Sequence, residues 1–182
     1  MKIRHSESLI LIWRLAGLEA RNLNAANIEP NHLILGLCKS VDVDLLALLK
    51  KDAPDRDEVL EELLREIRRL RTVFHAAGLD ACAFRRALRA KHGCKLVSPS
   101  VAAQLRRSAD TKRIFADAEH FAELDSSDVF PVHLLYAATI SPDELRDNLL
   151  DQMGVELKRL QTVAKREVVF SRSQENRRAG PN

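Results

Sequence analysis

The sequence predicts an all-α fold built from a duplicated four-helix unit, with a helical insertion between the two copies. Abundant Leu, Ala, Arg and Glu with only 6 glycines in 182 residues favour helix throughout, and no segment reads as a convincing strand. The segment from Ile28 to Leu37 also returns without a gap from Val129 to Ala138, 101 residues later, and the same offset pairs Trp13 with Ile114. Two matched helical units can bury against each other the apolar faces that neither buries alone.

The first helix is expected to follow Ser6, whose hydroxyl can cap it. An apolar stripe at three- and four-residue spacing follows, formed by Leu9, Trp13, Ala16, Ala20 and Leu23. We expect this stripe to lie in the core, because apolar stripes in helical bundles usually do. Partial exposure of Trp13 would instead indicate an interaction surface.

The next three helices complete the first unit, which we expect over about residues 6–64. Pro30 begins the second helix, because its missing N–H costs nothing in a first helical turn. The residues after it are almost wholly apolar, so this helix is predicted to be the buried centre of the unit. Asp42 can cap a third helix, and a fourth should run from about residues 52–55 to a stop at Gly78.

The second unit, expected over about residues 108–167, repeats this order. Its central helix should begin at Pro131. Ser141 and Glu144 have the spacing of a capping box, in which the serine accepts a bond from the third helical N–H, so they predict the start of the third helix. Gly154 should separate that helix from the last one.

The end of the chain and the segment between the units are predicted to be less regular. Residues 171–182 are polar and arginine-rich, which indicates a disordered tail or a linker and leaves one domain over residues 1–170. The insertion, over about residues 65–107, should contain the end of the fourth helix and a short helix that Asp80 caps and Gly93 closes.

Composition limits the class of protein. Three cysteines at unrelated spacings predict no disulfide scaffold, and no secretory signal precedes the first helix, so we expect a cytoplasmic protein. No apolar run is long enough to span a membrane. The net charge of +3, from 29 basic and 26 acidic residues, predicts no dominating field.

Positive charge is concentrated in the insertion. Between Arg65 and Lys91, eight basic residues stand against Glu66 and Asp80. Long arginines can solvate an exposed helix, or they can form a basic docking face for acidic partner segments or nucleic acid. No interleaved aromatic residues offer platforms for bases, which weighs against nucleic acid. The candidate partner-binding residues are Arg65, Arg68, Arg69, Arg71, Arg85, Arg86 and Arg89.

The duplicated motif resembles the N-terminal domain of Clp-family AAA+ unfoldases, also called the Clp N repeat domain. The residues that carry the resemblance run from Pro30 to Leu37, from Pro131 to Leu135 and from Leu149 to Glu156. The resemblance covers about residues 6–167 outside the insertion, and it implies a helical recognition module that docks adaptors or substrates for an ATPase ring. No Gly-x-x-x-x-Gly-Lys-Ser/Thr phosphate loop occurs, so no nucleotide cofactor is expected.

The same resemblance bears on phosphorylated arginine. Gram-positive-type relatives hold phosphoarginine with a glutamate just before each motif histidine. The matching positions here are Asn31 and Val132, and neither side chain supplies a carboxylate for a guanidinium group. We predict that these positions do not recognise phosphoarginine.

The repeat motif itself consists of Pro30 with His32 and Pro131 with His133. Each histidine falls one turn into a helix that should be buried, where an imidazole can satisfy backbone groups from a neighbouring loop. No nucleophile accompanies either one, and a general base needs a partner within hydrogen-bond reach. We therefore expect a structural role for both histidines.

Four residues of the insertion are types that bind zinc: His75, Cys82, His92 and Cys94. Their spacings match no common zinc pattern, and Cys82 falls on a helix where it can be core. No metal site is expected.

These observations together predict a non-enzymatic protein–protein interaction module that binds protein substrates or adaptors for a Clp-type ATP-dependent unfoldase, protease or disaggregase. No nucleophile, base and orienting group occur together, so an enzyme is not expected. Binding should use exposed grooves between the repeats and the arginine-rich insertion. The alternative is a helical nucleic-acid-binding or regulatory protein that uses the basic segment 65–91.

Overall fold

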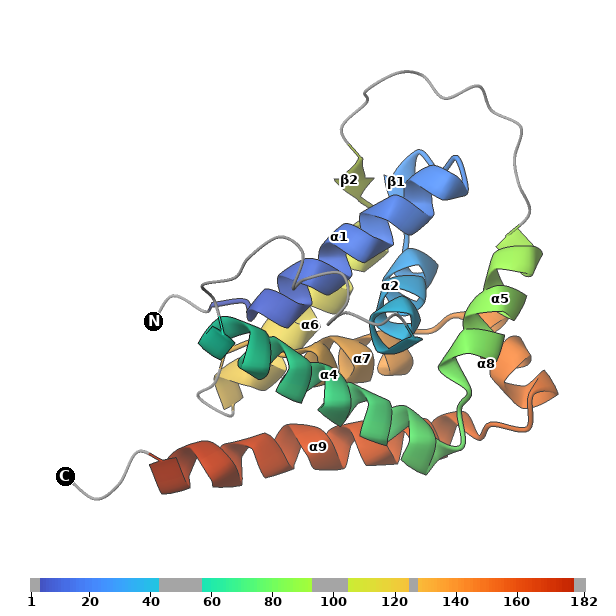
Figure 1. The fold of residues 1–182 in the computed structure, drawn as a ribbon. Coiled ribbons are helices and arrows are strands. Elements are labelled where there is room, and N and C mark those ends of the chain that lie inside the picture. The colour runs from blue at the N-terminus through green and yellow to red at the C-terminus, as the bar shows by residue number, and fades with distance from the viewer. Residues whose placement is uncertain (1–3, 43–56, 93–104, 125–127, 179–182) are drawn as a thin grey trace.

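The computed structural model describes residues 4–42, 57–92, 105–124 and 128–178 and is almost entirely helical, which confirms the predicted fold class (Figure 1). The elements in chain order are α1 (Glu7–Asn22), β1 (Asn27–Ile28), α2 (Pro30–Asp42), α4 (Asp57–Ala77), α5 (Ala81–His92), β2 (Arg106–Arg107), α6 (Ala109–Leu124), α7 (Pro131–Ile140), α8 (Glu144–Gln152) and α9 (Leu157–Arg178). The helix expected after Asp42, the helix start near residues 52–55 and the closing Gly93 lie outside the described residues.

The order of the helices follows the predicted duplication. Helices α1, α2 and α4 correspond to α6, α7 and α9, and the matched pair α4 and α9 have 21 and 22 residues. Residues 65–77, which were expected in the insertion, are thus the second half of a helix that α9 matches. The inserted material begins after Ala77, and its helix α5 starts as predicted, with the Ala83 N–H donating to Asp80 Oδ1 at 2.9 Å.

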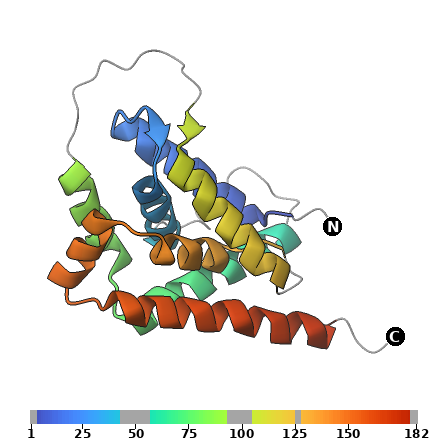
Figure 2. The same cartoon turned by 180° about the vertical axis from the view of Figure 1, so that it is seen from behind.

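The two central helices, α2 and α7, form the buried centre of the molecule. Leu33 and Leu134, which are repeat mates, are both fully buried. α2 packs between α1 and α5, and α7 packs between α6 and α9, as Figures 1 and 2 show from opposite sides. α4 and α9 run antiparallel and contact each other along one face. The prediction that the proline-initiated helices are central is confirmed.

The two repeats are not gapless. Ser6 and Ser108 cap α1 and α6 through hydrogen bonds from the Leu9 and Thr111 N–H groups, and these serines are 102 residues apart. Pro30 and Pro131 are 101 residues apart, so the loop between α6 and α7 is one residue shorter than the loop between α1 and α2. The expected pairing of Trp13 with Ile114 is therefore wrong. Ile114 corresponds to Ile12, and both side chains are fully buried.

Two short parallel bridges exchange backbone hydrogen bonds between the repeats. Ile28 of β1 pairs with Arg107 of β2, and His5 pairs with Val129. The Ser6 N–H continues the second bridge by donating to the Val129 carbonyl at 3.1 Å. Because Ile28 and Val129 are repeat mates, as are His5 and Arg107, each repeat completes the pairing of the other. The expectation that no strand occurs is wrong at these positions, where two paired residues are too few to show an alternating pattern.

The start of α8 differs from its prediction. Asp143 is the N-cap, because its Oδ1 accepts from the Arg146 N–H at 2.9 Å. Ser141 instead ends α7, where its N–H donates to the Ala137 carbonyl at 3.2 Å. Arg146 also holds the Ser141 carbonyl at 3.0 Å, which commits that residue to α7. The predicted capping box of Ser141 and Glu144 is therefore wrong.

The last helix is longer than expected. α9 continues through Arg178, so residues 171–178 are helical and not disordered, and the alternative that residues 171–182 form a linker stays a prediction. Gly78 and Gly154 end α4 and α8 as predicted, with φ of +77° and +71° in the left-handed region that glycine adopts without a steric cost.

Candidate functional site

The arginines of α4 are partly engaged by their own chain. Arg65 pairs with Glu62 one turn earlier at 2.8 Å, and Arg69 lies 3.7 Å from Glu167 of α9. The Arg68 side chain is exposed and makes no ion pair or side-chain hydrogen bond within the described residues. Of these three arginines, Arg68 alone has no side-chain partner in the described part of the molecule.

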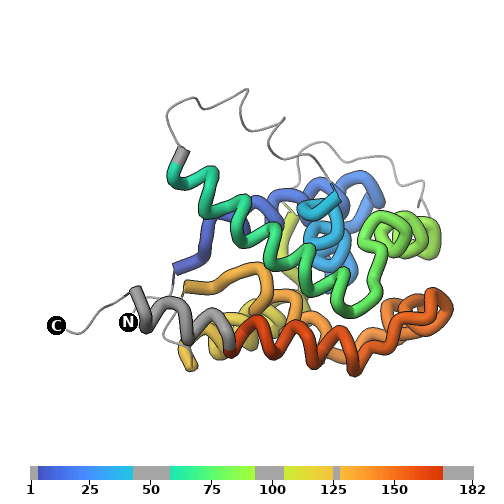
Figure 3. The backbone as a smooth tube through the Cα atoms, turned by 60° about the horizontal axis from the view of Figure 1, so that its bottom comes forward, coloured from blue at the N-terminus to red at the C-terminus, as the bar shows by residue number. Residues whose placement is uncertain are grey.

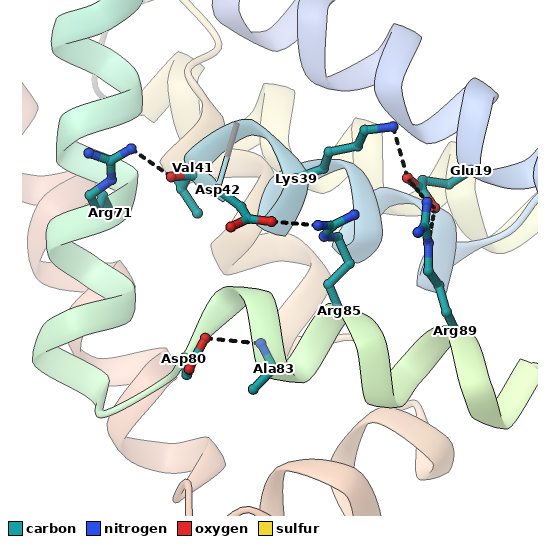
Figure 4. A network of polar contacts seen from close by, with 9 residues as sticks. All are labelled: Glu19, Lys39, Val41, Asp42, Arg71, Asp80, Ala83, Arg85 and Arg89. Atoms are coloured by element: carbon teal, nitrogen blue, oxygen red, sulfur yellow. Dashed lines mark hydrogen bonds and ion pairs between the residues drawn. The ribbon is translucent and has the colours of Figure 1, made fainter. Parts of the chain in front are cut away.

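Two further arginines close the C-terminal end of α2. Arg71 of α4 donates to the Val41 carbonyl at 2.6 Å, and Arg85 of α5 pairs with Asp42 at 2.5 Å (Figure 4). The last carbonyls of a helix have no partner within the helix, so a guanidinium from a neighbouring element satisfies both their hydrogen bonding and the negative end of the dipole. These arginines hold α2, α4 and α5 together.

Glu19 is the centre of a buried polar network that joins α1, α2 and α5. Its side chain is fully buried, and its two carboxylate oxygens accept from Arg89 Nε and Nη2, both at 2.6 Å (Figure 4). Lys39 of α2 lies 3.2 Å from the same carboxylate. The position that matches Glu19 in the second repeat is Phe121. Since no helix corresponding to α5 follows the second repeat in the described chain, the buried acid of repeat 1 is the residue that fastens α5 to α1 and α2.

Five of the seven candidate arginines therefore contact their own chain, and Arg68 and Arg86 are exposed without such contacts in the described part of the molecule. α5 packs beside α2 and also contacts α8 (Figure 3). That the seven arginines bind a partner stays a prediction. Arg68 and Arg86 are the two whose guanidinium N–H groups have no partner among the described residues.

A pocket of about 240 Å³ opens where α2 ends and α4 turns into α5. Asp42, Arg71 and Cys82 line it together with His75. Asp42 is already paired with Arg85, and Arg71 already donates to the Val41 carbonyl. Cys82 is only partly exposed. Within the residues that are described, no three His, Cys, Asp or Glu side chains are placed to hold a metal ion, and Cys94 of the considered zinc set lies outside them.

The two motif histidines cap their own helices. His32 Nδ1 accepts from the Glu29 N–H at 2.9 Å, and His133 Nδ1 accepts from the Phe130 N–H at 3.0 Å. Each histidine thus accepts a hydrogen bond from a backbone N–H that precedes its helix, as the glutamate of a capping box does. Burial lowers the pKa of both imidazoles to about 4, assisted by the nearby His92 for His32. Both rings are neutral acceptors at pH 7.

Replacing His133 with glutamine should remove about half of the acid sensitivity that the two histidines confer. A histidine whose folded pKa is about 4 and whose unfolded pKa is 6.5 favours the unfolded state as pH falls through that window, at about 2–3 kcal/mol per ring by pH 4. Glutamine keeps an acceptor for the Phe130 N–H but does not titrate. Urea unfolding at pH 7 and pH 4.5 measures the difference.

The matched control is His120→Gln, which removes an exposed imidazole from the neighbouring helix α6. This variant should lose as much stability between the two pH values as the unaltered protein. Equal acid sensitivity of the His133→Gln protein and the unaltered protein would show that the buried ring does not control it.

The two positions that the family resemblance placed in phosphoarginine pockets are buried. Asn31 is 9 % exposed and Val132 is 2 % exposed, each on the first turn of a central helix. The absence of phosphoarginine recognition there stays a prediction.

Glu66, one of the two acids in the basic stretch, is also buried. It accepts hydrogen bonds from the Ser6 hydroxyl at 2.7 Å and from the Ser8 hydroxyl, and burial raises the pKa of its carboxyl group. These bonds tie α4 to the first turn of α1. The buried Glu66 carboxyl group therefore joins two helices and is not part of the charged surface.

A surface cluster on the axis between the repeats was missed by the sequence prediction. Trp13 is partly exposed, its ring meets Phe115 of α6, and the Arg107 guanidinium lies over both rings. Exposure of Trp13 was the condition under which its stripe would indicate an interaction surface. The sequence did not indicate a role for Arg107, because the two-residue bridge that positions it has no recognisable sequence pattern.

The described helices include none with the length and apolar character needed to cross a membrane. No protein-family model and no curated protein matches the sequence.

Solved structures match the fold over nearly its whole length. A chain from a structural study of a malarial protein secretion system has a TM-score of 0.63 at 17 % identity and covers 91 % of this chain and 95 % of its own. The Hsp104 N-terminal domain from Candida albicans has 0.59 at 15 %, with 88 % and 89 % covered. The N-terminal domain of the caseinolytic protease associated chaperone ClpD from Arabidopsis thaliana has 0.60 at 19 %, with 91 % and 94 % covered. The chain has the fold of these Clp N-terminal domains.

Proposed function

We propose that this chain, with its Clp N-terminal domain fold, is a non-enzymatic protein–protein interaction module of a Clp-type ATP-dependent chaperone or protease system. The observation that carries the proposal is the extent of the match: about nine-tenths of this chain superposes on N-terminal domains of Hsp104 and ClpD that are themselves covered almost completely. The module would bind unfolded protein substrates or adaptors and present them to an ATPase ring in the cytoplasm.

The roles of the polar side chains in the described residues support protein binding over catalysis. The buried histidines act as helix caps, and the buried acids Glu19 and Glu66 are held by hydrogen bonds inside the fold. The arginines that stay available, Arg68 and Arg86, would contribute basic contacts to a partner. Nucleic-acid binding through residues 65–91 has less support, because most of the arginines there are bonded to their own chain.

Fluorescence anisotropy with a labelled, reduced and carboxymethylated protein that stays unfolded tests substrate capture, and its native form is the control. Saturable binding of the unfolded form alone supports the proposal. Association with native Clp-type ATPase subunits from the source cell, measured by cross-linking, tests the adaptor-type role. The proposal fails if neither associates, or if duplex DNA binds instead with a steep dependence on salt concentration.

A further inference from the structure

The aromatic pair Trp13 and Phe115 marks the pseudo-twofold axis of the molecule. The two residues are repeat mates, 102 residues apart, and their ring centroids lie 5.6 Å apart with the planes at 85°. Phe115 is 4 % exposed, while Trp13, the only tryptophan of the chain, is partly exposed. Trp13 is therefore the member of the pair that reaches solvent, and α1 and α6, which carry the two rings, lie side by side (Figure 2).

The Arg107 guanidinium covers this aromatic pair. Its Cζ lies 5.6 Å from the Trp13 ring centroid and 5.0 Å from that of Phe115, within the range of cation–π contacts. The bridge to Ile28 fixes the backbone of Arg107, so the side chain starts from a defined point. Stacking orders the planar group but leaves its edge donors accessible.

Arg107 has no carboxylate partner among the residues that the structure describes. Its repeat mate His5 holds the carboxylate on that side of the axis, with Nε2 and Glu119 Oε1 at 3.0 Å. The exposed Arg4 and Arg106 precede His5 and Arg107 in the chain and add positive charge. The Trp13 indole N–H also makes no hydrogen bond in the described part of the molecule. The partly exposed Trp13 ring thus lies beside a guanidinium and an indole N–H that have no hydrogen-bond or ion-pair partner among the described residues.

We propose that Trp13, Phe115 and Arg107 form a docking site for an acidic segment of a partner protein. Arg107 binds a carboxylate side chain of that segment in the bidentate geometry that guanidinium favours, and an adjacent apolar side chain packs on Trp13. The argument for this occupant is charge complementarity, since the site supplies a guanidinium beside the Trp13 ring, and no acid among the described residues pairs with that guanidinium. The site rests on the proposed function, for which it supplies one surface and the chemistry of the partner.

Trp13 fluorescence tests the site directly, because no other tryptophan contributes to the emission. The probe is a short peptide without tryptophan that carries Asp and Glu beside Leu and Phe, and its twin replaces the acids with Asn and Gln. We expect a saturable change of emission with the acidic peptide and little with the twin. Arg107→Gln should weaken the acidic peptide about tenfold or more, and Arg107→Lys should fall between, since lysine keeps the charge but loses the planar fork.

The matched control is Arg166→Gln, which removes an exposed arginine of α9 and should leave the affinity unchanged. Arg107 is exposed, and thermal unfolding followed by circular dichroism confirms that each variant is folded. Unchanged affinity of the Arg107→Gln protein overturns the site, as does an equal emission change with a basic peptide or with single-stranded DNA. If unfolded protein still binds in the anisotropy assay while the acidic peptide does not, the site is wrong and the proposed function stands. If both fail and no Clp-type ATPase subunit is cross-linked either, the proposed function fails with it.

Discussion

Replacing Arg89 with alanine should lower the free energy of unfolding by about 2–3 kcal/mol, the largest loss expected from any of the seven candidate arginines. The carboxylate of Glu19 is fully buried and receives both bonds of the Arg89 fork. Truncation leaves this buried charge with Lys39, at 3.2 Å, as its one remaining ion-pair partner among the described residues. Because α5 is fastened at this point, its helix should also become the least protected against hydrogen exchange. Urea unfolding followed by circular dichroism measures the free energy.

Arg86→Ala is the matched control, since Arg86 lies on the same helix, is exposed and makes no contact of this kind. Its effect should stay within about 0.5 kcal/mol. Replacing Glu19 and Arg89 together with leucine should recover most of the loss, because an apolar pair avoids the cost of burying charges, and the matching position of the second repeat carries Phe121. Equal stabilities of the Arg89→Ala and Arg86→Ala proteins would show that the ion pair contributes nothing.

The Gly36→Ala substitution should destabilise the protein by about 1–3 kcal/mol, although alanine is the better helix former. A Cβ on Gly36 would lie 2.8 Å from the Ile12 carbonyl oxygen and 3.0 Å from the Ala16 backbone nitrogen. Both are backbone atoms of α1, so the clash can be relieved only by moving α1 away from α2. The repeat mate, Ala137, carries a Cβ, so this close approach belongs to the first repeat alone. Thermal and urea unfolding give the change.

The control for this substitution is a second helical glycine. A Cβ on Gly17 would find its nearest neighbour, Ile28 Cδ1, at 3.7 Å, which is an ordinary contact. Gly17→Ala should therefore raise stability by up to about 1 kcal/mol, through helix propensity. The two substitutions are chemically identical and should have opposite signs. A gain of stability for Gly36→Ala would show that the two helices are free to separate.

The parts of the fold that sequence could predict are those that local physics decides. Pro30 and Pro131 set helix starts because proline is favoured in a first turn, and Gly78 and Gly154 set helix ends because each takes a positive φ. The wholly apolar run after each proline identified the central helices, since no other place in a small bundle accepts such a segment.

The parts that could not be predicted depend on contacts between distant segments. The sequence predicted Ser141 as the cap of α8, whereas Asp143 is the cap, because Arg146 holds the Ser141 carbonyl at the end of α7. The basic stretch gave no sign that Arg85 and Arg89 are bonded to acids 43 and 70 residues away, so the charge excess in the sequence exceeds the charge that the surface offers.

The exchanged bridges have a consequence for how the molecule is held together. Each repeat has one paired segment before its first helix and one before its central helix. Each of these segments pairs with the segment of the opposite kind in the other repeat. A half-chain with a single repeat would be complementary to a copy of itself, so two half-chains could assemble with twofold symmetry through the same two bridges. The covalent connection in this chain replaces that concentration-dependent assembly by an intramolecular one at high effective concentration. The single chain thus has the architecture of a pseudo-symmetric dimer whose two halves are covalently joined.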